Sequence, residues 1–125
     1  LGYIGRADEP TRIIFKGGRI VDIEETPTGI RLKKYMEEYF DPRIYIAGEL
    51  GIGLNSCSNC LGNCYIEDES AYGTFHVRLG RNIALGGVQN AKGHFDLVCR
   101  EPDIFTDNRQ IMDRGKIIAP EPVLY

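Results

Sequence analysis

The first part of the chain contains two short apolar runs and one longer run with a different period. Residues 11–24 place β-branched side chains on either side of a Gly-Gly pair, which suits the two-residue turn of a β-hairpin. Residues 28–40 place apolar side chains three to four positions apart, the spacing of one helix face. Thr28 is a suitable N-cap, and Asp41-Pro42 ends the predicted helix.

The rest of the chain reads as short strands separated by loops. Strands are predicted over residues 43–48, 72–80, 93–100, 103–106 and 109–119, the last two as a hairpin that turns near residues 113–115. Residues 49–64 and 81–92 are rich in glycine and asparagine and predict two long loops, which are usually functional in compact domains. The predicted class is α+β, mostly antiparallel β with one or two helices.

Length and composition limit the organisation and the partners. With 125 residues the chain forms one domain over residues 11–125, and the polar residues 1–10 read as a linker or N-terminal extension. The net charge of −3 and the absence of a basic patch argue against nucleic acid. No apolar stretch reaches the roughly 18–20 residues of a membrane helix. Four cysteines are few for a disulfide scaffold, which favours a reducing, cytoplasmic location.

The two histidines lie in predicted strands beside the glycine-rich loops. The two-residue period of a strand puts His94 and Asp96 on one face, while His76 and Arg78 share a face of the preceding strand. Glu49 opens the first glycine-rich loop. Imidazole and carboxylate groups together suit Zn²⁺, Co²⁺, Mn²⁺ or Fe²⁺. Spacing alone leaves a structural hydrogen-bond network equally open, and Arg78 suits either a substrate carboxylate or a structural ion pair.

Three cysteines follow Glu49 within the first loop. Cys57, Cys60 and Cys64 would hold a second metal ion or an iron–sulfur cluster, with Cys99 as a fourth ligand. The alternative is a loop of small residues near the metal site or at a dimer contact. Strand alternation predicts that Cys99 points to the core, away from Asp96, which weakens the four-cysteine arrangement.

Three blocks of the sequence resemble a known enzyme family. The blocks are AGELGIGLN (47–55), GTFHVRLG (73–80) and GHFDLVC (93–99). They are similar, in this order, to segments of the thermophilic metallo-aminopeptidases, the aminopeptidase T or leucyl aminopeptidase-like family. The likeness covers about residues 12–118. It implies the C-terminal domain of a two-domain, homodimeric metallo-enzyme that releases N-terminal amino acids from small peptides.

The resemblance also implies a ligand set and a chemistry. Glu49, His76, His94 and Asp96 match ligands of two neighbouring Zn²⁺, Co²⁺ or Mn²⁺ ions, and Glu49 is the expected bridge between them. Two such ions polarise the scissile carbonyl and lower the pKa of bound water. The first interpretation of the sequence is therefore a metal-dependent aminopeptidase-like hydrolase, as a fragment or a divergent member.

Several departures from the peptidase pattern favour two alternatives. A further glutamate ligand of the family would fall before Leu1, and a family tyrosine that would stabilise an oxyanion is replaced by Ile83. Some relatives resemble 2,5-dihydroxypyridine dioxygenase, a ring-cleaving enzyme with one non-haem Fe(II). His76, His94 and Asp96 would supply the two-histidine, one-carboxylate triad of such a site, with a small aromatic substrate. The other alternative is a non-catalytic metal-binding domain.

Overall fold

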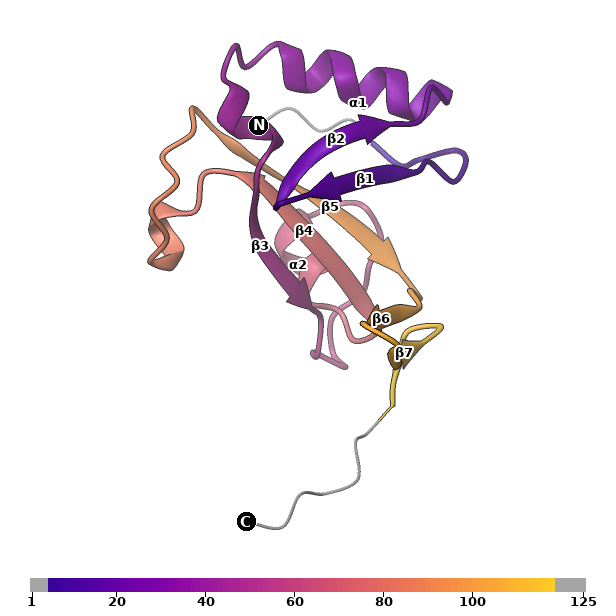
Figure 1. The fold of residues 1–125 in the computed structure, drawn as a ribbon. Helices are drawn as coiled ribbons and strands as arrows, with labels where there is room; N and C mark the ends of the chain where they lie inside the picture. The colour runs from indigo at the N-terminus through magenta and orange to yellow at the C-terminus, as the bar shows by residue number, and fades with distance from the viewer. Residues whose placement is uncertain (1–4, 119–125) are drawn as a thin grey trace. The chain divides into compact units, whose positions relative to one another are not determined.

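The computed structural model describes residues 5–118 of the chain and shows the predicted α+β class (Figure 1). Its strands form three small, mostly antiparallel sheets, with orders β1-β2, β3-β4-β5 and β6-β7-β8. The chain divides into two compact units. One contains the residues up to Glu49 together with Val77–Asp96, and the other contains Leu50–His76 and the residues from Leu97 onward. No helix among residues 5–118 is long and apolar enough to cross a membrane.

The first unit begins with the predicted hairpin and helix. Strands β1 (Ile13–Lys16) and β2 (Arg19–Ile23) pair antiparallel around the glycine turn. Helix α1 (Pro27–Glu37) follows, and its N-cap is Thr26 rather than Thr28, because Pro27 occupies the first helical position and Thr26 Oγ1 accepts the N–H of Gly29 at 3.0 Å. The N-cap prediction was therefore two residues late.

The segment after α1 differs from the prediction. Asp41-Pro42 starts an element instead of ending one: Asp41 caps a short 3-10 helix, η1 (Pro42–Tyr45). Strand β3 then runs over Ala47–Ile52, so the predicted strand over 43–48 is displaced toward the C-terminus. Glu49 consequently lies inside a strand and not at the start of a loop.

Short helices and strands alternate through the middle of the chain. They are α2 (Tyr65–Ser70), β4 (Thr74–Gly80), η2 (Ile83–Leu85) and β5 (His94–Arg100). The two strands were predicted, whereas the short acidic helix α2 was not. In the first unit Leu32, Met36, Ile44 and Leu79 are almost completely buried. Phe95 of β5 contacts the ring of Tyr35 edge-on at 5.3 Å between centroids, which packs the apolar face of this strand on α1.

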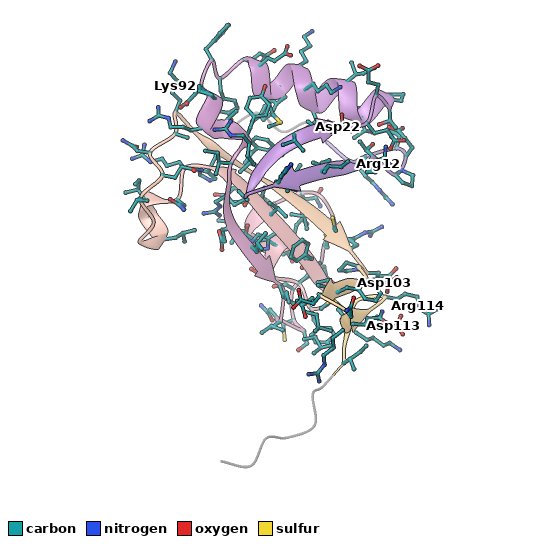
Figure 2. The ribbon with its side chains drawn as sticks, in the orientation of Figure 1. Arg12, Asp22, Lys92, Asp103, Asp113 and Arg114 are labelled. Atoms are coloured by element: carbon teal, nitrogen blue, oxygen red, sulfur yellow. The ribbon has the colours of Figure 1, made fainter. Side chains whose placement is uncertain are left out.

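The second unit ends in a three-stranded antiparallel meander. Its strands are β6 (Ile104–Thr106), β7 (Arg109–Asp113) and β8 (Lys116–Ile117). The predicted hairpin turn near residue 114 is present between β7 and β8. A second turn, at Asp107-Asn108, separates β6 from β7. Asp103 supports the later turn by accepting the backbone N–H of Arg114 at 2.8 Å (Figure 2).

Candidate metal centre

Two carboxylates meet one guanidinium on neighbouring strands. Arg78 Nε of β4 lies 3.3 Å from Glu49 Oε2 of β3 and 3.0 Å from Asp96 Oδ1 of β5. The Asp96 side chain is only 3% exposed and that of Arg78 13%. The guanidinium offsets the repulsion between the two carboxylates and lets both stay in a poorly solvated place. Of the two roles predicted for Arg78, the ion pair is the one present.

His76 occupies the same face of β4 as Arg78, two residues earlier. It is buried, with 6% exposure. Its ring lies over Gly51 of β3, where a Cβ atom would overlap the imidazole, so only glycine leaves room for it. The glycine-rich character of the AGELGIGLN block thus has a steric purpose here. It makes space for an imidazole rather than forming a flexible loop.

Three of the four predicted ligands come together. Glu49, His76 and Asp96 each offer a ligand atom, and these atoms lie within 4.8 Å of one another. One imidazole and two carboxylates are a donor set that Zn²⁺, Mn²⁺, Co²⁺ and Fe²⁺ accept, so the residues fit a divalent ion. His94 lies half-buried on β5, two residues before Asp96, and outside this group of three. It stays a predicted ligand.

The cysteines are not members of this group. Cys57, Cys60 and Cys64 lie between β3 and helix α2, and none of them forms a disulfide. Cys99 is exposed near the end of β5, so the prediction that it faces the core was wrong. The last two residues of β5, Cys99 and Arg100, are both exposed, so strand alternation does not decide which side chain is buried there.

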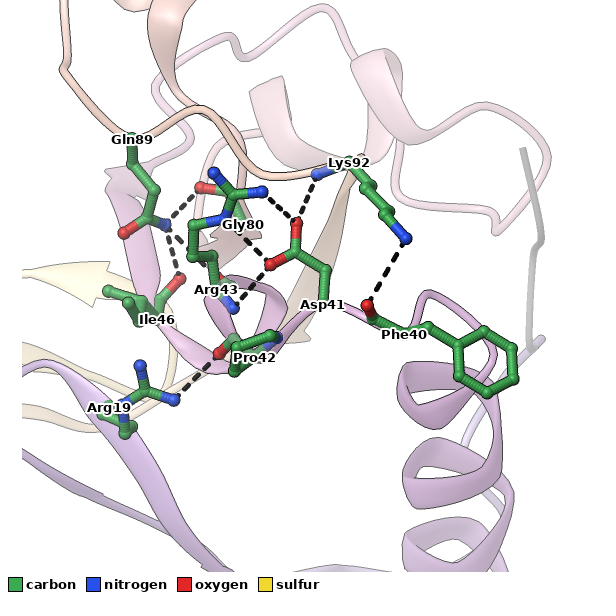
Figure 3. Close-up of polar contacts among 9 residues, drawn as sticks. All are labelled: Arg19, Phe40, Asp41, Pro42, Arg43, Ile46, Gly80, Gln89 and Lys92. Carbon is green, nitrogen blue, oxygen red and sulfur yellow. Dashed lines mark hydrogen bonds and ion pairs between the residues drawn. The ribbon is translucent and has the colours of Figure 1, made fainter.

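A polar cluster that sequence analysis missed joins η1 to the segment over residues 81–92 (Figure 3). Asp41, whose side chain is 2% exposed, receives a two-pronged ion pair from Arg43 at 2.8 and 2.9 Å and the N–H of Lys92 at 2.8 Å. The hydrogen bonds from Arg43 hold the pKa of Asp41 well below its usual range. From the sequence, the Asp41-Pro42 pair was interpreted only as the end of the predicted helix.

Comparison with known proteins finds relatives that are dioxygenases. The family model described as 2,5-dihydroxypyridine 5,6-dioxygenase matches residues 3–119. A 2,5-dihydroxypyridine 5,6-dioxygenase from Pseudomonas putida is 28% identical over 99 residues, which cover 72% of this chain and 28% of that protein. The solved structure of 2,5-dihydroxypyridine dioxygenase from Pseudomonas putida KT2440 is 27% identical with a TM-score of 0.73, over 89% of this chain and 35% of that one.

These matches correct the first interpretation of the sequence. The family and both relatives are dioxygenases, so the aminopeptidase family, and with it hydrolase and metalloprotease chemistry, was the wrong choice. The chain spans less than a third of the length of the curated relative.

Proposed function

The chain belongs to the 2,5-dihydroxypyridine 5,6-dioxygenase family, and we propose that it carries metal ligands of an Fe(II)-dependent dioxygenase that opens a hydroxylated aromatic ring. The observation that carries this proposal is the group of Glu49, His76 and Asp96, whose donor atoms are close enough for one ion. Bound Fe(II) would supply the one-electron chemistry that lets molecular oxygen react with an aromatic ring.

The proposed ligand set combines the structure with the sequence. His76 and Asp96 would bind the ion together with His94, in the two-histidine, one-carboxylate arrangement that leaves positions open. Glu49 supplies a second carboxylate in the same group. Burial of His76 over Gly51 restricts its ring to one orientation, which lowers the entropy lost when an ion binds.

Arg78 has a role beside the ion. Its guanidinium holds Glu49 and Asp96 near each other before any ion binds. A planar guanidinium also recognises oxyanions, so Arg78 would bind an ionised ring oxygen of the substrate and orient the ring. A homodimeric, cytoplasmic enzyme with a small aromatic substrate remains our expectation, and nothing in the composition favours nucleic acid or membrane as a partner.

Iron content and oxygen uptake test the proposal. The metal-free chain is loaded with Fe(II) without oxygen, desalted and analysed for iron, beside His76→Ala, Asp96→Asn and the control Cys57→Ser. We expect the wild type and the control to retain iron and the two site variants to lose it. Oxygen uptake on addition of 2,5-dihydroxypyridine should follow iron content. Iron that stays in both site variants would contradict the ligand assignment, and retained iron without oxygen uptake would contradict the activity.

A further inference from the structure

Two amide side chains beyond the end of β4 bond the backbone of β3 and the residue before it. Asn82 Nδ2 donates to the carbonyl of Gly48 at 3.0 Å, and its Oδ1 accepts the backbone N–H of Gln89 at 2.9 Å. Gln89 Nε2 in turn donates to the carbonyl of Ile46 at 3.2 Å and to that of Gly80 (Figure 3). The carbonyls of Ile46 and Gly48, two residues apart, are therefore both held immediately before Glu49.

These bonds fix the alignment of β3 with the end of β4. The backbone N–H of Gly80 donates to Ile46 at 2.9 Å, so one carbonyl receives both a strand bond and the Gln89 amide. A one-residue slip in a sheet turns each side chain to the opposite face. Such a slip would break the bonds of Asn82 and Gln89 together, and the pair therefore favours a single register.

Close approach in this region depends on glycine. A Cβ atom at Gly48 would lie 2.8 Å from the carbonyl oxygen of Gly80 and 3.2 Å from Cβ of Asn82. A Cβ atom at Gly87 would overlap the Asn82 amide group. Gly86 has a positive φ of 84° and turns the chain back, so the Gly86-Gly87 pair forms the turn that brings Gln89 to the strand.

We propose that Asn82 and Gln89 are positioning residues for Glu49. Glu49 directly follows the carbonyl that Asn82 holds, and its carboxylate lies 3.3 Å from Arg78 Nε. Loss of either amide leaves a strand carbonyl without its side-chain partner and frees the backbone at Glu49 to shift. This inference rests on the proposed metal centre. It assigns to residues 81–92 the role of supporting that centre.

The test measures Co²⁺ affinity by titration of the metal-free chain. Asn82→Ala and Gln89→Ala are compared with Asn90→Ala, which removes an exposed asparagine from the same segment. Residues that support a metal ligand typically change metal affinity about 10- to 100-fold, and we expect a loss in this range for the first two variants only. Equal affinities in all three variants would overturn the proposal.

A double-mutant cycle separates positioning from general stability. In a Glu49→Gln background, Asn82→Ala should cause little further loss of Co²⁺ affinity, because its effect passes through Glu49. An undiminished loss in that background would show that Asn82 acts elsewhere and would contradict the proposal.

Amide hydrogen exchange of the metal-free chain provides a readout that needs no ion. The N–H of Gly80, bonded to Ile46, should exchange faster in Asn82→Ala and Gln89→Ala than in Asn90→Ala. Unchanged exchange would overturn the inference. A wild-type chain that binds no Co²⁺ but shows faster exchange in both variants would contradict the proposed metal centre and still support the fixing of β3.

Discussion

Two segments of similar composition, residues 53–64 and 81–92, are held in different ways. Both are rich in glycine and asparagine. In the first, Asn55 Oδ1 accepts the N–H of Cys57 at 2.9 Å, and the N–H of Asn59 reaches a carboxylate of helix α2 at 3.2 Å. These side-chain bonds span two and eight residues and stabilise local turns, while the backbone of Gly53 and Asn55 pairs with residues 70–74.

The second segment is held over long distances in sequence. Asn82 bonds the carbonyl of Gly48, 34 residues earlier, and the N–H of Lys92 bonds Asp41, 51 residues earlier. The comparison shows that composition predicts a loop but not what the loop supports. Asn82 of the second segment bonds the carbonyl directly before Glu49 and can set the position of that residue, whereas the Asn55 side chain bonds residues two and three positions away.

The largest expected effect comes from breaking the long-range attachment at Asp41. Asp41→Ala leaves the N–H of Lys92 and the guanidinium of Arg43 without their shared acceptor, and hydrogen bonds to a charged group contribute more than neutral ones. We expect it to lower the melting temperature, measured by circular dichroism, more than any single substitution in residues 53–64. Asp22→Ala, at an exposed strand position, is the control (Figure 2). Equal melting of the two variants would contradict a structural role for Asp41.

The same attachment predicts an acid sensitivity. The folded state lowers the pKa of Asp41, so its carboxylate contributes stability above the unfolded value of about 3.9, and this contribution is lost as the pH falls below that value. Urea unfolding of wild type between pH 7 and pH 3 should therefore lose stability more steeply below about pH 4 than Asp41→Asn does. Parallel curves for the two proteins would show that Asp41 does not provide this dependence.

A smaller effect is expected from the Asn55 side chain in the segment over residues 53–64. Asn55→Ala removes the acceptor for the N–H of Cys57 and the donor to Ser58 Oγ, and should lower the free energy of unfolding by about 0.5–1.5 kcal/mol for each bond lost, the usual net value of one hydrogen bond. Co²⁺ affinity should not change, because the Asn55 side chain bonds Cys57 and Ser58, neither of which belongs to the metal-binding group. A loss of affinity comparable with that of Asn82→Ala would remove the distinction between the two segments.

The smallest effect is expected for the cysteines. Replacing Cys57, Cys60 and Cys64 together by serine should leave the iron content and the melting temperature nearly unchanged, because these cysteines form no disulfide and lie outside the metal-binding group. In the wild type a thiol reagent should modify the exposed Cys57 and Cys64 without denaturant. Loss of metal in the triple variant would reinstate the predicted cysteine site.

Sequence reasoning predicted the elements whose pattern is local. The hairpin around its glycine pair, helix α1 and strands β4 and β5 follow from periodicity and turn residues, and they are confirmed within a few residues. It misplaced the start of β3, because Asp41 caps a short 3-10 helix where the β-branched residues suggested a strand. It also missed α2, whose six residues are too few to show a helical period.

The candidate site was likewise predicted only in part. Strand alternation placed His76 with Arg78 and His94 with Asp96, and the conjunction of these residues with Glu49 predicted a divalent-metal group. The resemblance to aminopeptidases gave the wrong family and the wrong principal activity. The dioxygenase alternative is the one that agrees with the family match.

The sequence by itself determined which side chains share a strand face, because a strand alternates with a period of two whatever surrounds it. Only the tertiary structure decided which strands lie side by side, and so which carboxylates share Arg78 and which carbonyl accepts from Asn82. Those contacts join residues 18 to 34 positions apart. No local period or turn residue encodes such pairings, since they depend on the packing of the whole unit.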